Sequence, residues 1–148
     1  MPPITCHILD SSIGKPASDV LCCLYKVFPK TDLSELDETL FAMSNTNSDG
    51  RIANWIINPE IDASWLDIHI SSSISDGDDP TKETKTWDSG ITSGQYKIRF
   101  YTKKYFDSKG EKTFYPFVDI HFNIENNAEH YHIPLLLTNY SYTTYRGS

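Results

Sequence analysis

The sequence contains little cysteine, with three residues in a chain of 148. Cys6, Cys22 and Cys23 cannot all pair, and the adjacent Cys22 and Cys23 would face opposite sides of an extended strand. This pattern argues against a disulfide framework. We therefore expect reduced thiols and an intracellular protein.

Basic residues are also in the minority, with 13 Lys and Arg against 20 Asp and Glu, which gives a net charge of -7. Nucleic acids and anionic membranes attract basic surfaces, so we expect neither of them as a partner. A small anionic ligand remains compatible with this composition, because one arginine in a pocket can override the field of the whole protein.

Long hydrophobic runs are missing as well. A helix that crosses a bilayer needs about 20 predominantly apolar residues in succession, and no segment of the chain approaches that length. The N-terminal residues lack the basic flank and the apolar stretch of a secretion signal. We expect no membrane-spanning segment.

Aromatic residues are plentiful, with nine Tyr, seven Phe and three Trp, many of them in alternating segments that favour β structure. We predict a single, mainly β domain over residues 1–148, an antiparallel β-sandwich of seven to eight strands with one short helix. The expected strands lie at 4–10, 20–28, 40–44, 52–57, 64–71 and 94–100, in a segment that begins at 114, and on both sides of residue 139; the expected helix covers 102–109 and stops at Gly110.

Two acidic stretches give weaker signals. Leu33, Leu36 and Leu40 have near-helical spacing, so residues 32–41 are compatible with a short helical turn or with a solvated loop that leads into a strand. Residues 72–85 predict an exposed acidic loop. Its aspartates lack the ligand spacing of an EF-hand, which argues against a calcium site of that type.

The C-terminal stretch predicts a hairpin and a site. An antiparallel hairpin centred near Asn139 places His132 opposite the residues around Gly147. An imidazole would then lie beside Tyr145, Arg146, Gly147 and the hydroxyl and carboxylate of Ser148. Polar groups gathered around a histidine in this way suggest a functional site.

His7 and Arg51 are further candidates. Period-two alternation places Cys6 and Ile8 on the core face of the first strand, which leaves His7 on the opposite face. Arg51 follows the strong turn signal at 45–50 and precedes an apolar segment. Taken alone, each residue is more typical of a solvated surface position than of a site.

The histidines also allow a metal site. His130 and His132 share one face of a strand, and together with His7 they offer three imidazoles to zinc. The spacing alone does not choose between His130 and His132. The alternative interpretation of His130 is a side chain that points into solvent near the start of its strand.

These residues carry a family resemblance. His-Tyr-His-Ile-Pro-Leu-Leu-Leu at 130–137 and the terminal Tyr-Arg-Gly-Ser resemble the signature of the 5-hydroxyisourate hydrolases, the enzymatic branch of the transthyretin-like proteins. Thr-Cys-His-Ile-Leu-Asp at 5–10, with Gly-Lys-Pro-Ala after it, is similar to the opening motif of that family. Asp-Gly-Arg at 49–51 resembles the motif whose arginine enters the active site. The resemblance weakens at 32–41 and at 58–93, where an inserted segment is expected.

The resemblance implies a transthyretin-like β-sandwich that assembles as a homotetramer around a channel, with active sites at subunit interfaces. It implies no metal and no cofactor, and it selects His132 over His130. Family members occur in the cytosol or the peroxisome. Arg-Gly-Ser does not match a peroxisomal address of the Ser-Lys-Leu type, so we expect a cytoplasmic protein.

The implied reaction is the hydrolysis of 5-hydroxyisourate, the unstable product of urate oxidation, to 2-oxo-4-hydroxy-4-carboxy-5-ureidoimidazoline. His7 and His132 would handle the protons, and Arg51 would bind substrate oxygens and stabilise the oxyanion. Which histidine is the base stays open. Near the chain end, Tyr145 and Ser148 would hold the ring and the water. Arg146 and Gly147 would fix the terminus.

Two other functions are weighed against the hydrolase. A transthyretin-like carrier would bind a small aromatic ligand without chemistry, and it would need neither the two histidines nor Tyr-Arg-Gly-Ser. A structural β-sandwich module would leave the polar terminus unexplained.

Overall fold

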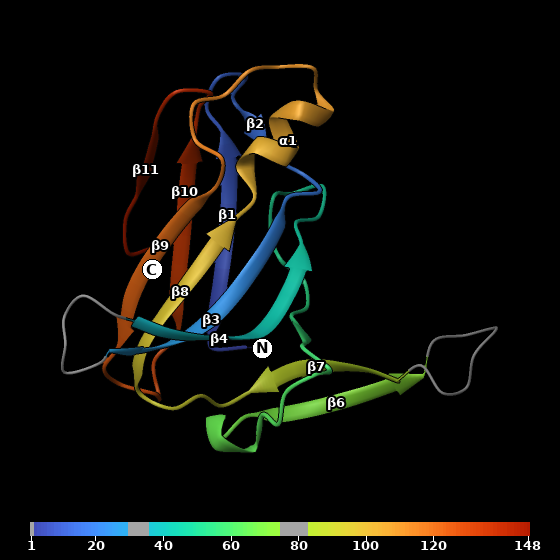
Figure 1. Cartoon of the computed structure of the whole chain (residues 1–148), viewed down its shortest axis with the longest axis vertical. Helices are drawn as coiled ribbons and strands as arrows, with labels where there is room; N and C mark the ends of the chain where they lie inside the picture. Colours follow the sequence, from blue (N-terminus) through green and yellow to red (C-terminus); the bar gives the residue numbers. More distant parts are fainter. Residues whose placement is uncertain (1, 30–35, 75–82) are drawn as a thin grey trace.

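A computed structural model describes residues 2–29, 36–74 and 83–148 (Figure 1). Two β-sheets pack face to face. Within the described residues the sheets contain eleven strands, and the chain has one α-helix besides. The smaller sheet has the order β11-β10-β1-β2 and the larger sheet the order β6-β7-β5-β4-β3-β8-β9. The strands are β1 (Ile4–Asp10), β2 (Lys15–Pro16), β3 (Leu21–Pro29), β4 (Leu36–Asn45), β5 (Ile56–Ile57), β6 (His69–Ile74), β7 (Glu83–Ser89), β8 (Gly94–Phe100), β9 (Val118–Ile124), β10 (Tyr131–Leu137) and β11 (Tyr142–Thr144).

The predicted mainly β sandwich with one short helix is confirmed. The number of strands exceeds seven to eight, and the two that were not among the expected segments are β2 and β7. Of the pairings between described strands, all are antiparallel except that of β1 with β10, which is parallel. This central pair of the smaller sheet places the first strand of the chain beside the last but one.

The core lies between the two sheets and is rich in aromatic side chains. Phe41 makes edge-to-face contacts with Trp87 and Tyr96, with ring centroids 5.8 and 5.9 Å apart. Trp55 is completely buried, and its indole nitrogen donates a hydrogen bond of 3.0 Å to the carbonyl oxygen of Ile4 in β1. Such aromatic pairs combine large apolar burial with fixed geometry. These two pairs join β4, β7 and β8 of the larger sheet, whereas the hydrogen bond of Trp55 reaches β1 of the smaller sheet.

Helix α1 (Thr102–Ser108) confirms the expected helix at 102–109. A buried carboxylate ties it to β1: Asp10 has no exposed surface and accepts hydrogen bonds from Tyr105, at 2.8 Å, and from Lys109, at 3.1 Å. The hydroxyl and the backbone N–H of Ser12 donate to the same side chain. Burial alone would raise the pKa of Asp10, but these donors outweigh it and lower the pKa below its ordinary value.

Several predicted boundaries were wrong. Residues 64–66 form a 3₁₀ turn instead of a strand, since Asp62 caps the amide of Ser64 and Asp67 is left-handed, so β6 begins only at His69. The strand expected at 40–44 already begins at Leu36, because that segment pairs with the end of β3. Residues 32–35 of the ambiguous stretch lie outside the described residues.

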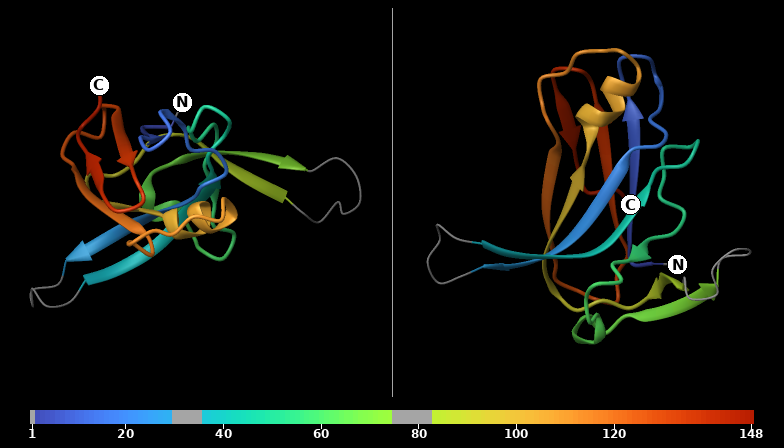
Figure 2. Two further views of the ribbon diagram at one scale, coloured as in Figure 1. Left: turned by 90° about the horizontal axis from the view of Figure 1, so that it is seen from above. Right: turned by 45° about the vertical axis from the view of Figure 1, so that its right-hand side comes forward.

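Three further segments differ from expectation. The strand expected at 52–57 is reduced to β5, because the chain crosses between the sheets there. The strand expected from 114 begins at Val118. The acidic loop expected at 72–85 is narrower, since β6 continues to Ile74 and β7 starts at Glu83; residues 75–82 lie outside the described residues. In Figures 1 and 2, the hairpin of β6 and β7 projects from the side of the sandwich.

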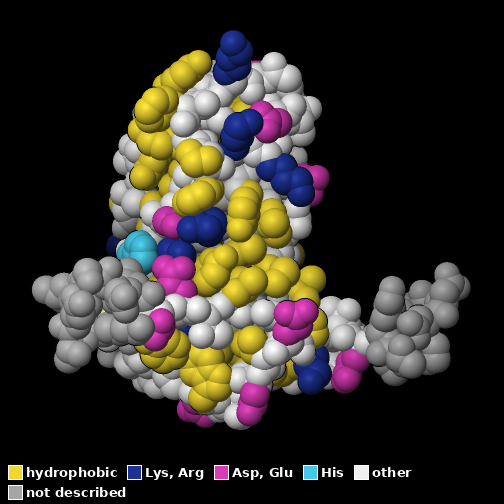
Figure 3. Space-filling model, viewed as in Figure 1, with side chains coloured by type: hydrophobic (Ala, Val, Ile, Leu, Met, Phe, Trp, Pro, Cys, Tyr) yellow, Lys and Arg dark blue, Asp and Glu magenta, His cyan; other side chains and the backbone are white. Residues whose placement is uncertain are grey.

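The outer face of the larger sheet carries a cluster of paired charges. Lys97 of β8 is 2% exposed and forms ion pairs of 2.6 Å with Glu38 and 3.5 Å with Asp119. Arg99 binds both carboxylate oxygens of Asp119, at 2.8 and 2.9 Å. Figure 3 shows basic and acidic side chains next to one another on this face. No helix in the described part of the chain is both long and apolar enough to cross a membrane.

Candidate active site

Six of the seven predicted site residues line one cavity of about 500 Å³ on the smaller sheet. They are His7, Arg51, His132, Tyr145, Gly147 and Ser148. In sequence they span almost the whole chain, so this convergence is a property of the fold. The structure therefore brings these six residues to one cavity.

The parallel pairing of β1 with β10 brings the two histidines together. His132 lies opposite Thr5, and His7 lies opposite Pro134, two positions further along both strands. Residues two apart on a strand share a face, so both imidazoles point to the same side of the sheet. Both side chains are half-buried.

A tight turn delivers Arg51 to this face. The side chain of Asn47 accepts hydrogen bonds from the amides of Asp49 and Arg51, and Arg51 then bridges to His7. Gly50 has a φ of +74°, and a Cβ there would lie 2.4 Å from the carbonyl oxygen of Ile8. Only glycine fits this close approach, which explains why glycine precedes the arginine.

The chain end packs against His132 as the hairpin predicted. Gly147 and His132 form an antiparallel bridge, with a hydrogen bond of 2.9 Å from the amide of Gly147 to the carbonyl oxygen of His132. A Cβ at residue 147 would lie 2.5 Å from Cδ2 of the imidazole. The absence of a side chain at Gly147 thus allows the backbone to rest against the ring and leads Ser148 into the cavity.

The surroundings of His132 favour its neutral form. Burial lowers the pKa of His132, and the positive charge of Arg51 and the neighbouring His130 and His7 lower it further. An imidazole that stays unprotonated near neutral pH can accept a proton from water.

Thr5 and His130, which were not predicted as site residues, complete this group. The Thr5 hydroxyl oxygen lies 2.8 Å from Nδ1 of His132 and 3.1 Å from Nε2 of His130. His130 is solvent-exposed as the alternative interpretation had it, but its ring is held by this contact. The alternation of β1 places Thr5 on the same face as His7, and this pattern could have marked Thr5 as a site residue. The pairing of β1 with β10, which brings Thr5 to His132, was not predictable from local pattern.

The three imidazoles do not form a metal site. Across residues 2–29, 36–74 and 83–148, no group of three His, Cys, Asp or Glu side chains is arranged to hold a metal ion. The ring nitrogens of His130 and His132 that face each other are separated by the Thr5 hydroxyl, which they share.

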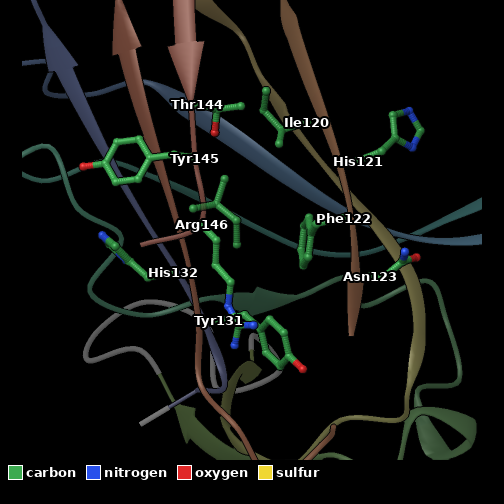
Figure 4. Close-up of a pocket in the computed structure, with 10 residues that line it drawn as sticks. Ile120, His121, Phe122, Asn123, Tyr131, His132, Thr144, Tyr145 and Arg146 are labelled. Carbon is green, nitrogen blue, oxygen red and sulfur yellow. The ribbon is translucent and has the colours of Figure 1, made fainter. Parts of the chain in front are cut away.

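Arg146, the seventh predicted residue, lines a different cavity of about 330 Å³ between β9 and the β10–β11 hairpin (Figure 4). Its guanidinium lies over the ring of Tyr131, 4.7 Å from the centroid, and forms an ion pair of 3.1 Å with Glu129. His132 lines both cavities and stands between them. Arg146 therefore shares a cavity with His132 and Tyr145 but does not line the cavity that contains His7 and Arg51, because neighbouring residues of an extended chain point to opposite sides.

The sandwich and its site define a class: a transthyretin-like protein that carries two imidazoles, a guanidinium and the chain end in one cavity. The sequence matches the HIUase/Transthyretin family over residues 4–147, and the chain belongs to this family. It is 36% identical over 147 residues to a probable 5-hydroxyisourate hydrolase of Schizosaccharomyces pombe, which covers 99% of this chain and 92% of that protein.

Other relatives agree. The 5-hydroxyisourate hydrolase of Mus musculus is 32% identical over 146 residues, with 99% of this chain and 95% of that protein covered. The crystal structure of transthyretin from Sparus aurata superposes with a TM-score of 0.66 at 23% identity, with 98% of this chain and 96% of that chain covered. The latter likeness concerns the fold alone, and it confirms the transthyretin-like sandwich.

Proposed function

We propose that this protein hydrolyses 5-hydroxyisourate to 2-oxo-4-hydroxy-4-carboxy-5-ureidoimidazoline in urate degradation. The observation that carries this proposal is the single cavity that gathers His7, Arg51, His132 and Ser148. It is supported by a probable 5-hydroxyisourate hydrolase at 36% identity and a 5-hydroxyisourate hydrolase at 32% identity, each similar over nearly the whole chain.

The reaction needs three kinds of help. The oxygen of water bonds to a ring amide carbonyl carbon while its proton passes to a base, and the carbonyl oxygen becomes anionic. The carbon–nitrogen bond then breaks, and the departing nitrogen takes up a proton. A carboxyl group and an opened ring result. Water is the only co-reactant, so the proposed reaction uses no cofactor.

The site residues suit these tasks. His132 is the proposed base, because its lowered pKa keeps the imidazole neutral. His7 lies on the same face and would return the proton to the departing nitrogen. Arg51 would bind the flat, oxygen-rich ring through parallel hydrogen bonds and stabilise the oxyanion, since a guanidinium keeps its charge at every physiological pH.

The chain end would complete the pocket. Tyr145 and Ser148 line the cavity and would hold the ring and the attacking water. Gly147 would fix the terminus through its contact with His132, and Arg146 through its contacts with Tyr131 and Glu129.

The assembly and location are further parts of the proposal. We propose one domain over 1–148, with an inserted segment at about 58–93, that assembles as a cytoplasmic homotetramer with its sites at subunit interfaces. The exposure of Arg51 and Ser148 supports such a contact, because a second subunit would cover both residues.

A rapid-mixing absorbance assay tests the function. Urate oxidase generates 5-hydroxyisourate in place, and its decay is followed with and without this protein and with a chelator. Accelerated decay that is insensitive to chelator is the expected result. An acceleration lost on chelation would contradict the metal-free reaction, and no acceleration from a folded sample would favour the carrier.

The variant His132→Asn tests the role of His132 as the general base. We expect turnover to fall by about 100-fold or more, the usual contribution of a positioned general base, while circular dichroism stays unchanged. His121→Asn, on the exposed side of β9, is the control and should retain wild-type turnover. Wild-type turnover of the His132 variant would exclude the proposed proton transfer.

A further inference from the structure

One hydroxyl links two imidazoles at the rim of the proposed active site. Thr5 Oγ1 lies within hydrogen-bond distance of Nδ1 of His132 and of Nε2 of His130. Thr5 and His132 are direct partners in the parallel β1–β10 pair, so the contact is fixed by strand register. His130 lies two residues before His132 and reaches the same hydroxyl.

We infer that Thr5 and His130 are positioning residues that select the tautomer of His132. In this arrangement the Nδ1–H of His132 donates to the Thr5 oxygen, and the Thr5 hydroxyl donates to Nε2 of His130. The free lone pair of His132 is then on Nε2, the nitrogen that would accept the proton of the attacking water. The inference rests on the proposed hydrolytic function.

The argument follows from the number of protons available. A hydroxyl has one proton to donate, and a neutral imidazole has one N–H and one lone pair. If the hydroxyl donates its proton to one of the two imidazoles, two arrangements can satisfy the three groups. In the one described above, His132 keeps a lone pair on Nε2. In the other, the Thr5 hydroxyl donates to Nδ1 of His132, and His132 carries its proton on Nε2, where it cannot act as a base.

The reaction itself distinguishes the two arrangements. Once His132 has taken a proton from water it is an imidazolium, and both of its ring nitrogens must donate. The first arrangement already has Nδ1 as a donor to Thr5, so no group needs to rotate when the charge forms. The second would require the hydroxyl to turn away. A third group that fixes the tautomer of a histidine base is a recurrent requirement of such sites.

His130 is needed because it gives the hydroxyl proton an acceptor. Were His130 to become protonated, its Nε2 would turn into a donor and the hydroxyl would lose that acceptor. The groups that face this trio are His7 on β1, Arg51 on the adjoining turn, and the Ser148 terminus, which all line the same cavity.

Thr5→Val and Thr5→Ser form the matched pair of variants. Valine has the shape of threonine without the hydroxyl, and serine keeps the hydroxyl without the methyl group. We expect kcat of Thr5→Val to fall by about 10- to 100-fold, a part of the contribution of a general base, with KM changed by less than about twofold. Thr5→Ser should restore most of the lost turnover.

Nitrogen NMR of histidine-labelled protein reports the tautomer directly and needs no substrate. His132→Asn assigns the signals of His132. We expect wild type and Thr5→Ser to show an Nδ1–H, Nε2 lone-pair pattern at His132, and Thr5→Val and His130→Ala to show a mixture of tautomers. A packing defect alone would not change the balance between the two nitrogens.

Three results would overturn the inference. They are an unchanged tautomer pattern in Thr5→Val, an equal loss of turnover in Thr5→Ser and Thr5→Val, and a rise in KM without a fall in kcat. Failure of the hydrolytic function is recognised separately, because wild type would then fail to accelerate the decay of 5-hydroxyisourate, whatever the NMR pattern of His132.

Discussion

At the scale of single residues, the close approach of Gly147 to the imidazole of His132 determines the shape of the site. A methyl group at this position would overlap Cδ2 of the ring, so Gly147→Ala must displace either the imidazole or the chain end. We expect kcat to fall by about 10- to 100-fold, since small misplacements of reacting groups are costly, while the fold is retained.

Rapid-mixing turnover and urea denaturation check this prediction together. Thr143→Ala, on the exposed strand β11 of the same hairpin, is the control and should leave both turnover and stability close to wild type. If Gly147→Ala turned over at the wild-type rate, the contact between the terminus and His132 would have no part in catalysis.

The titration of His132 is a second prediction at this scale. Burial and the nearby cationic groups lower its pKa, so His132 should titrate with a midpoint below the ordinary value of 6.5. Arg51→Gln removes one of these positive charges, and the midpoint should move upward. Proton NMR of the imidazole signals measures both values, and low salt makes the difference larger.

Lys104→Gln provides the control, because it removes the same charge from an exposed position on α1. Its effect on His132 should be small. The direction of the pKa shift of His132 also determines how the stability of the fold depends on pH. A histidine with a lowered native pKa stabilises the fold above its unfolded pKa, and this contribution is lost as the pH falls towards the native value. A titration midpoint at or above 6.5 would contradict the assignment of His132 as the base.

At the scale of elements, the buried carboxylate of Asp10 joins β1 to α1. Asp10→Asn replaces a charge that Lys109 and Tyr105 face, and it leaves the ammonium of Lys109 without its buried partner. We expect the free energy of unfolding to fall by about 3 kcal/mol at pH 7, as for other broken buried ion pairs. Asp107→Asn, in the exposed pair with Lys103, should cost less than about 1 kcal/mol.

The pH dependence of this loss has a definite sign. The native pKa of Asp10 lies below its ordinary value of 3.8, so its stabilising contribution is complete above that value and disappears as the pH falls through the lowered native pKa. The difference between wild type and Asp10→Asn in urea denaturation should therefore narrow as the pH falls below 3.8. A constant difference across this range would mean that the charge of Asp10 does not contribute.

The elements also show what the sequence could and could not predict. The alternation of β1 is a local pattern that placed His7 on the face opposite the core, whereas the turn at 45–50 located Arg51 along the chain and only the family motif linked it to the site. The contact of Thr5 with His132 joins residues 127 positions apart through a parallel strand pair, and no local pattern encodes such a pairing. The prediction of a strand at 64–71 was wrong at its start for a local reason. The amide of Ser64 donates to the side chain of Asp62, and residues 64–66 form a turn in spite of their alternating pattern.

At the scale of the whole molecule, the proposed tetramer raises the question of which subunit supplies each site residue. His7, Arg51, His132 and Ser148 line one cavity within a single chain. Each subunit should therefore carry a complete set of these residues, with the neighbouring subunit acting as a cover. Static light scattering is expected to give four times the mass of the chain, which is 16.9 kDa.

Mixed assemblies test this division of roles. When His132→Asn and Arg51→Gln subunits are co-expressed and purified through two different tags, the mixed assembly should stay inactive, because neither chain holds a complete set. Assemblies of wild-type and His132→Asn subunits should lose activity in proportion to the fraction of variant chains. Recovery of activity in the doubly variant assembly would show instead that His132 and Arg51 of one site come from different subunits.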